Sequence, residues 1–121
     1  MFGWGKNRGA TATAGAPTPT NVDAASLQGM LEGPDAPLVL DVRQPEEYAA
    51  GHIPGAVLLP LPQLNHRFAE LPEDRLVVCV CRSGGRSGVA AHLLRAKQRN
   101  VRNLSGGMLG WRGPVRRGSK P

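Results

Sequence analysis

The stretch Cys81-Arg82-Ser83-Gly84-Gly85-Arg86-Ser87 stands between two sequence patterns of different character. Residues 76–80 before it form a continuous apolar run, which is typical of a buried strand. Residues 87–98 after it have the spacing of apolar side chains expected for a helix. The pattern therefore predicts that Cys81 lies at the carboxyl end of a strand, in a glycine-bearing loop that leads into a helix.

This placement favours a cysteine that is ionised and a loop that binds anions. The first turn of a helix leaves backbone N–H groups without partners and carries the positive end of the helix dipole. Gly84 and Gly85 permit the positive φ angles that a curled loop needs. Arg82 and Arg86 add positive charge, and either could hold an oxyanion. We expect a lowered pKa for Cys81, whereas the alternative is a buried structural cysteine beside a turn.

The size and composition of the chain are those of one domain with an aliphatic core. It has 121 residues, of which 40% are hydrophobic, and two cysteines. Cys79 and Cys81 are two positions apart in a strand, where a disulfide would be strained, so we expect a reducing compartment. The chain lacks an apolar run of membrane-spanning length and a secretory signal pattern. The sequence thus predicts a soluble, cytoplasmic protein without a membrane partner.

Charge is distributed unevenly along the chain, whose formal net charge is +6. All nine acidic residues lie between Asp23 and Asp74, and eleven of the fifteen basic residues lie from Arg75 onward. The half that carries Cys81 is therefore cationic, which favours small anionic substrates. A nucleic-acid surface is the alternative interpretation, but no aromatic platform or nucleic-acid motif accompanies the charge, so no nucleic-acid partner is expected.

Residues 1–20 are rich in Gly, Ala, Thr and Pro and are predicted to be a flexible tail. After them, segments with strand and helix patterns alternate. A helix is expected to begin after the N-cap Asp23, and others are expected around residues 45–48, 64–71 and 87–98, the last with Val89, Leu93 and Leu94 facing inward. Strands are expected at residues 38–40, 56–59, 76–80 and 101–104, with a final turn or short helix over residues 105–111.

This alternation predicts an α/β domain with a mostly parallel central sheet flanked by helices. In such sheets, ligands bind beyond the carboxyl ends of the strands. Asp41 and Cys81 each follow a predicted strand, so we expect them to lie at one site.

Four segments of the chain, taken together, resemble the rhodanese family of sulfurtransferases. They occur in the order and at the separations usual for that family, and they extend from about Val22 to Trp111. The segments are Leu40-Asp41-Val42-Arg43 with Glu47-Tyr48, Gly51-His52-Ile53-Pro54-Gly55-Ala56, residues 81–87, and Leu104-Ser105-Gly106-Gly107-Met108 with Trp111.

The resemblance implies a single-domain rhodanese fold in which Cys81 is the nucleophile and forms a persulfide. It implies that the backbone N–H groups from Arg82 to Ser87, including those of Ser83, Gly84 and Gly85, cradle the sulfur, and that Arg86 closes the loop. Asp41 is similar to an aspartate that steadies the active-site region, and Arg43 and Glu47 are similar to a structural ion pair. His52 would have an architectural role, with a catalytic base as the alternative.

The implied reaction is a ping-pong transfer of sulfane sulfur. Cys81 would take sulfur from an anionic donor such as thiosulfate and pass it to a thiol, or to cyanide in an assay. No metal or organic cofactor is expected, because the three histidines and two cysteines lack the spacing of metal ligands.

The domain is predicted over residues 21–113. Residues 114–121 depart from the family pattern and are predicted to form a basic tail, and Cys79 is predicted to be a small core residue.

Two alternatives share the same loop chemistry. The domain could be a persulfide carrier that relays sulfur to an acidic partner protein, which would suit its basic half. It could instead be a cysteine phosphatase or arsenate reductase, but those enzymes have five residues between Cys and Arg. Here four residues separate Cys81 from Arg86. The shorter loop suits a single sulfur atom better than a tetrahedral oxyanion.

Overall fold

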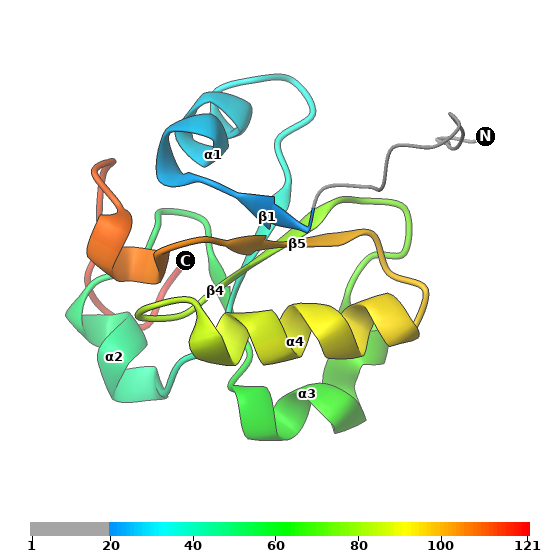
Figure 1. Ribbon diagram of the computed structural model, residues 1–121. Coiled ribbons are helices and arrows are strands. Elements are labelled where there is room, and N and C mark those ends of the chain that lie inside the picture. Colours follow the sequence, from blue (N-terminus) through cyan, green and yellow to red (C-terminus); the bar gives the residue numbers. More distant parts are fainter. Residues whose placement is uncertain (1–19) are drawn as a thin grey trace.

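A parallel sheet forms the centre of the protein, as the alternation of patterns predicted (Figure 1). The computed structural model describes residues 20–121, so the predicted tail over residues 1–20 lies, except for Thr20, outside the described residues. The strand order is β1-β5-β4-β2-β3, and every neighbouring pair is parallel. The strands are β1 (Asn21–Val22), β2 (Leu38–Asp41), β3 (Val57–Leu58), β4 (Val77–Val80) and β5 (Val101–Leu104).

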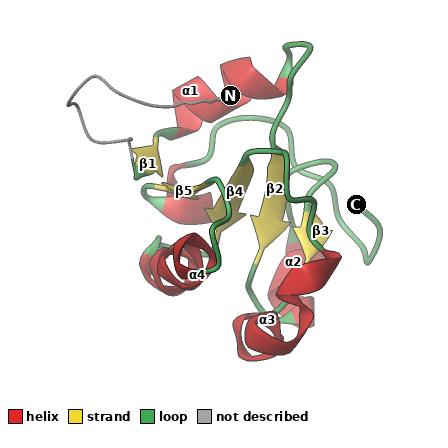
Figure 2. Ribbon diagram, turned by 90° about the vertical axis from the view of Figure 1, so that its right-hand side faces the viewer, coloured by secondary structure: helices red, strands yellow, loops and turns green. Residues whose placement is uncertain are grey.

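Helices cover both faces of this sheet (Figure 2). The helices α3 and α4 pack on one face and α1 packs on the other, where Tyr48 of α2 also contributes to the core. The helical segments are α1 (Ala24–Leu31), α2 (Pro45–Ala50), α3 (Leu61–Arg67), α4 (Gly85–Ala96) and the short 3₁₀ turns η1 (Phe68–Glu70) and η2 (Gly107–Gly110).

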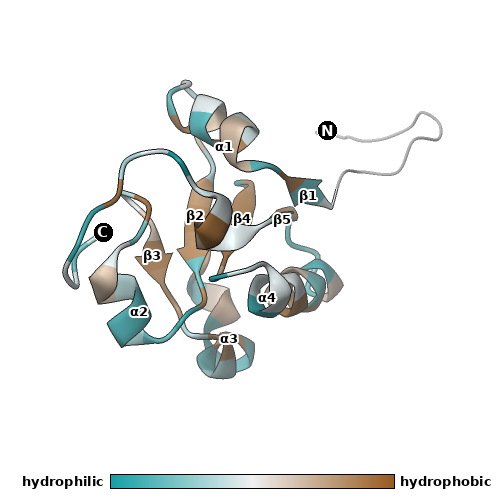
Figure 3. Ribbon diagram, turned by 60° about the vertical axis from the view of Figure 1, so that its left-hand side comes forward, coloured by the Kyte–Doolittle hydropathy of each residue, from teal (hydrophilic) through white to brown (hydrophobic). Residues whose placement is uncertain are grey.

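The central strand β4 is buried on both faces, which explains its continuous apolar sequence. Side chains alternate along a strand, so Cys79 and Cys81 lie in the same core cluster as Leu94 of α4. Val78 and Val80 lie in the opposite cluster. Figure 3 shows hydrophobic colour concentrated in the strands β2, β3 and β4 and a mixture of hydrophilic and hydrophobic colours along the helices. Cys81 is therefore anchored by the most buried strand of the sheet.

Two local predictions are corrected by the structure. Val89 was expected to face inward, but it is 57% exposed, because the inward stripe of α4 consists of other residues at helical spacing. That stripe is Ser87, Ala90, Ala91 and Leu94. In addition, β1 was not predicted, since two residues are too few to show an alternating pattern.

The N-cap role of Asp23 is confirmed, because its Oδ1 accepts the N–H of Ser26 at 2.7 Å.

The chain after Trp111 packs back against the end of α2 and the segment that follows it. The Trp111 Nε1–H donates to the carbonyl oxygen of Pro114 at 2.9 Å. His52 and Arg116 exchange two backbone hydrogen bonds, and the N–H of Gly118 donates to the carbonyl oxygen of Ala49 at 2.9 Å. These contacts order part of residues 114–121, whereas the domain boundaries given above remain predictions.

The turn η2 supports the loop that begins at Cys81. The N–H groups of Met108 and Leu109 donate to the carbonyl oxygens of Cys81 and Arg82 at 2.9 and 3.0 Å. Gly107 makes this approach possible, because its φ is +55° and a Cβ there would lie 2.5 Å from both of those carbonyl oxygens. The second glycine of the Gly106-Gly107 pair is thus needed for close contact with the cysteine loop.

Substitution of Gly107 is therefore expected to destabilise the folded protein. We expect Gly107→Ala to lower the free energy of unfolding by about 1–3 kcal/mol, because the backbone of the cysteine loop must move to admit the methyl group. Urea unfolding followed by circular dichroism measures this change. Gly110→Ala in the same turn is the control, because its Cβ would meet nothing within 4 Å. Equal effects of the two substitutions would contradict this account of Gly107.

Candidate active site

Cys81 lies directly after β4, at the carboxyl edge of the sheet. The residue is only 1% exposed. Its Sγ accepts the backbone N–H of Gly84 at 3.0 Å, and the hydroxyl oxygen of Ser87 lies 3.2 Å from it. Gly84 has a φ of +108°, which turns its N–H back toward the sulfur. The expectation of a positive φ is confirmed for Gly84 and is wrong for Gly85, which begins α4.

The surroundings of Cys81 lower the pKa of its thiol. Burial is the largest single influence and raises the pKa. Hydrogen bonds from the Ser87 side chain and from the N–H groups of Ser87, Gly84 and Ser83 act in the opposite direction. Together they outweigh burial, so the pKa of Cys81 lies below its ordinary value. Neutral donors are thus the groups that stabilise the anionic sulfur, as predicted for the loop, whereas Arg82 and Arg86, which were expected to contribute, are not among these causes.

Two ion pairs surround the loop, but they are not the pair that was expected. The guanidinium of Arg43 lies on the carboxylate of Asp41 at 2.8 Å, and both side chains are buried. Arg86 pairs with Glu47 through two hydrogen bonds of 2.7 and 2.9 Å. The predicted Arg43–Glu47 pair is therefore wrong, because Arg43 folds back over the end of β2, the strand that it follows, while Glu47 pairs with Arg86 of the cysteine loop.

Each pair joins two parts of the site. Arg43 also donates to the carbonyl oxygen of Gly51 at 2.7 Å, so it connects the end of β2 to the turn after α2. The Glu47–Arg86 pair connects α2 to the first turn of α4. Asp41 and Cys81 do lie at the same sheet edge, because Asp41 is in register with Val80. Asp41 nevertheless contacts Arg43 rather than serving the sulfur directly.

Arg82 and Ser83 are exposed at the outer part of the loop. Among residues 20–121, no carboxylate pairs with Arg82, whereas Arg86 is occupied by Glu47. The positive charge available to an incoming anion within the loop therefore comes mainly from Arg82. This division between the two arginines could not be derived from their positions in the sequence.

Asn103 of β5 is a site residue that the sequence analysis missed. Its Oδ1 lies 2.5 Å from the Ser87 hydroxyl oxygen, and its Nδ2–H donates to the carbonyl oxygen of Gly84 at 3.1 Å. It therefore contacts both residues that approach the Cys81 sulfur. A possible signal was a polar residue within a short strand that pairs with β4, where Asn103 is in register with Cys79.

Comparison with known proteins identifies the family. A model of the family described as the rhodanese-like domain matches residues 23–114. The chain belongs to the rhodanese-like domain family. The expected fold class and the resemblance seen in the four sequence segments are thereby confirmed.

Relatives of this rhodanese-like domain include proteins named as a sulfurtransferase and as a putative sulfur carrier. It is 42% identical to a protein named sulfurtransferase from Allochromatium vinosum, over 74% of this chain and 85% of that protein. It is 41% identical to the putative sulfur carrier protein YrkF of Bacillus subtilis, over 62% of this chain and 41% of that protein. The crystal structure of a rhodanese-related protein from Thermoplasma volcanium superposes with a TM-score of 0.75 at 29% identity, covering 79% of this chain and 96% of that one.

Cys79 and His52 are packed inside the rhodanese-like domain. Cys79 is fully buried, and burial raises the pKa of its thiol to about 12, which agrees with the prediction of a small core residue. His52 is fully buried, its ring stacks on Tyr48 with centroids 3.7 Å apart, and its Nδ1 lies 2.9 Å from the Tyr48 carbonyl oxygen. These are the contacts of an architectural side chain.

Residues 20–121 contain no group of three or more His, Cys, Asp or Glu side chains arranged to hold a metal ion. Within the same described part of the chain, every helix is too short or too polar to span a bilayer.

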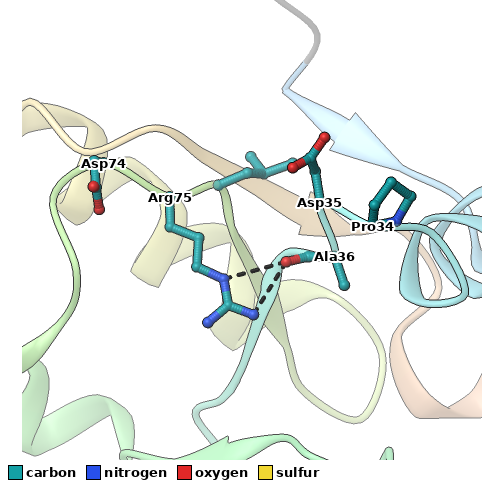
Figure 4. Close-up of a pocket in the computed structure, with 6 residues that line it drawn as sticks. Pro34, Asp35, Ala36, Asp74 and Arg75 are labelled. Carbon is teal, nitrogen blue, oxygen red and sulfur yellow. Dashed lines mark hydrogen bonds between the residues drawn. The ribbon is translucent and has the colours of Figure 1, made fainter.

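A polar hollow of about 630 Å³ lies at the opposite edge of the sheet from Cys81, before the first residues of β2 and β4 (Figure 4). Arg75 reaches across this hollow and donates to the carbonyl oxygen of Ala36 at 3.1 and 3.2 Å. Asp35 and Asp74 also line it. Its position at the amino ends of the strands separates it from the sulfur site.

The Glu47–Arg86 pair predicts how stability changes with pH. The hydrogen bonds from Arg86 hold the pKa of Glu47 at about 2, below its ordinary value of 4.5. This stabilisation is therefore complete above pH 4.5 and is lost as the pH falls toward 2. We expect Glu47→Gln to lower the free energy of unfolding at pH 7 by about 1 kcal/mol, since the pair is partly exposed, and to lower it less at pH 3.

Urea unfolding at pH 7 and pH 3 measures this dependence. Glu46→Gln is the matched control, because Glu46 also lies in the first turn of α2 and is exposed. A Glu47→Gln effect that is the same at both pH values, or that Glu46→Gln reproduces, would contradict the assigned pair.

Proposed function

We propose that the protein is a sulfurtransferase that carries sulfane sulfur as a persulfide on Cys81. The donor is a small anion such as thiosulfate, and the acceptor is a thiol, with cyanide as an assay substitute. The observation that carries this proposal is the buried Cys81 sulfur, which accepts N–H hydrogen bonds and has a lowered pKa. A lowered thiol pKa raises the fraction of nucleophilic thiolate at neutral pH, which favours attack without a neighbouring base.

In the first half-reaction, the Cys81 thiolate attacks the outer sulfur of thiosulfate. A bond forms between Sγ and that sulfur, the sulfur–sulfur bond of thiosulfate breaks, and sulfite leaves with the bonding electron pair. The negative charge of the thiolate then resides on the outer sulfur of the persulfide. The N–H groups of residues 82–87 are suited to hold this charge, because preorganised donors favour the anionic states of the reaction.

In the second half-reaction, an acceptor thiolate attacks the outer sulfur of the persulfide. The bond from this sulfur to Sγ breaks, and Cys81 returns to the thiolate. The same N–H donors serve both half-reactions, since the negative charge moves only between Sγ and the sulfur bonded to it. No proton transfer to a base is required in either half.

The geometry favours this reaction over phosphate or arsenate chemistry. Cys81 is 1% exposed, so a substrate must present a single atom to Sγ rather than place an oxyanion around it. Arg86, the arginine that would bind the oxygens of such an anion, is already held by Glu47. A loop with these two properties suits a sulfur atom of a small donor.

A persulfide relay to a protein acceptor is the second candidate, and one observation favours it. Eleven of the fifteen basic residues follow Asp74, in the half that carries Cys81. This charge favours an acidic acceptor protein. The relation to a protein named as a putative sulfur carrier agrees with this role. Two free cysteines also agree with a reducing compartment such as the cytoplasm.

The role of Cys81 is tested by substitution. We expect Cys81→Ser to abolish sulfur transfer from thiosulfate to cyanide, because the hydroxyl is not ionised at neutral pH and cannot form a persulfide. Cys79→Ser is the control for loss of a thiol, and it should retain activity if folded, since Cys79 is buried and un-ionised. Thiocyanate formation is the readout. Persistent turnover by Cys81→Ser would exclude the proposal.

The role of Arg82 is tested by the dependence of rate on donor concentration. We expect Arg82→Gln to raise the KM for thiosulfate by about tenfold, with a smaller change in kcat. A change of this size corresponds to the usual contribution of one charged hydrogen bond to binding. Arg112→Gln is the control, because it removes an equal charge from an exposed position outside the loop. Equal increases in KM for both variants would indicate attraction by the overall charge rather than binding by Arg82.

A further inference from the structure

We propose that Asn103 is a positioning residue that competes with the Cys81 thiolate for the one hydrogen of the Ser87 hydroxyl. The Ser87 oxygen lies between two groups, 2.5 Å from Oδ1 of Asn103 and 3.2 Å from Sγ of Cys81. A hydroxyl has one hydrogen, so it can donate to only one of them at a time. The choice between them affects the charge on the sulfur.

The short oxygen–oxygen distance shows where this hydrogen lies while Cys81 is a thiol. Two oxygens at 2.5 Å repel each other unless a hydrogen lies between them. Asn103 Oδ1 carries no hydrogen, and the orientation of the amide is fixed because its Nδ2–H donates to the carbonyl oxygen of Gly84. A flipped amide would place Oδ1 against that carbonyl oxygen. The hydrogen therefore belongs to Ser87 and points toward Asn103.

This arrangement leaves lone pairs of the Ser87 oxygen facing the sulfur. A Cys81 thiol can donate its S–H to them, but a thiolate has no hydrogen to offer. To gain the Ser87 hydrogen bond, the thiolate must draw the hydroxyl hydrogen away from Asn103, which leaves Oδ1 beside an oxygen lone pair. Ionisation of Cys81 therefore costs the Ser87–Asn103 hydrogen bond, whereas the bond from the Gly84 N–H is unaffected.

The competition for the Ser87 hydrogen also affects the form of the protein that carries sulfur on Cys81, and this inference rests on the proposed function. In a Cys81 persulfide, the negative charge lies on the outer sulfur and Sγ is bonded to two atoms. The Ser87 hydroxyl can then donate to Asn103 again. Asn103 thus stabilises the thiol and persulfide forms relative to the free thiolate, and it favours the loading of Cys81 with sulfur.

The test is a double-mutant cycle read by thiolate absorbance as a function of pH. Asn103→Leu keeps a side chain of similar size and removes the acceptor, so the Ser87 hydrogen becomes available to the sulfur. We expect the ratio of thiolate to thiol at a given pH to rise about three- to tenfold, which is the effect expected when one hydrogen bond to the thiolate is gained. In a Ser87→Ala background, the same Asn103→Leu change should no longer raise the ratio, because only the loss of the hydrogen bond to Gly84 remains.

A purely structural role for Asn103 predicts the opposite sign. If Asn103 only holds Gly84 in place, its loss loosens the loop and lowers the thiolate ratio, with or without the Ser87 hydroxyl. A decrease, no change, or an equal change in both backgrounds would each overturn the proposal.

A second measurement on the otherwise unchanged protein keeps the proposal testable if Asn103→Leu does not fold. The ¹³Cγ chemical shift of Asn103 should follow the ionisation of Cys81, because Oδ1 loses its hydrogen bond as the thiolate forms. Ser87→Ala should remove this titration, and a shift that stays constant in the presence of Ser87 would overturn the proposal. Neither readout uses a sulfur donor, so failure of the sulfurtransferase proposal is distinguishable from failure of this one.

Discussion

The hydrogen bond from the Gly84 N–H to the Cys81 sulfur, 3.0 Å long, is the interaction on which the rest of the site depends. It exists because Gly84 adopts a φ of +108°, which returns the backbone to the sulfur just before α4 begins. The surrounding structure holds this turn from three sides. The η2 turn supports it with Gly107, the Glu47–Arg86 pair closes it on the side of α2, and Asn103 holds the Gly84 carbonyl group.

The charged side chains near the sulfur are mostly engaged with one another. Arg43 is neutralised by Asp41 in the buried base of the site, and Arg86 is neutralised by Glu47 at its edge. The lowered pKa of Cys81 therefore comes from hydrogen-bond donors that carry no net charge. Such donors stabilise an anion without forming an ion pair that a substrate would have to break. The backbone N–H donors among them also remain in place when the charge moves from Sγ to an attached sulfur.

Most of the helices and strands could be predicted from local sequence patterns, because burial of apolar side chains set each pattern. The apolar run before Cys81 required burial on both faces, and only a central strand such as β4 provides it. Partner choice was harder to predict, since it depends on where side chains meet in space. Glu47 was assigned to Arg43 but pairs with Arg86, and Asn103 was hidden within a predicted strand. Val89 was misplaced because helical spacing alone does not define the buried face.

The central claim, that Cys81 carries sulfur within this loop, is tested most directly by intact mass spectrometry of the reduced protein before and after thiosulfate. The account predicts a gain of one sulfur atom that is removed by a small thiol, absent in Cys81→Ser and retained in Cys79→Ser. Alkylation before thiosulfate treatment should label Cys81 and block the gain. No added sulfur on a protein whose Cys81 is readily alkylated, or the same gain in Cys81→Ser, would contradict the account.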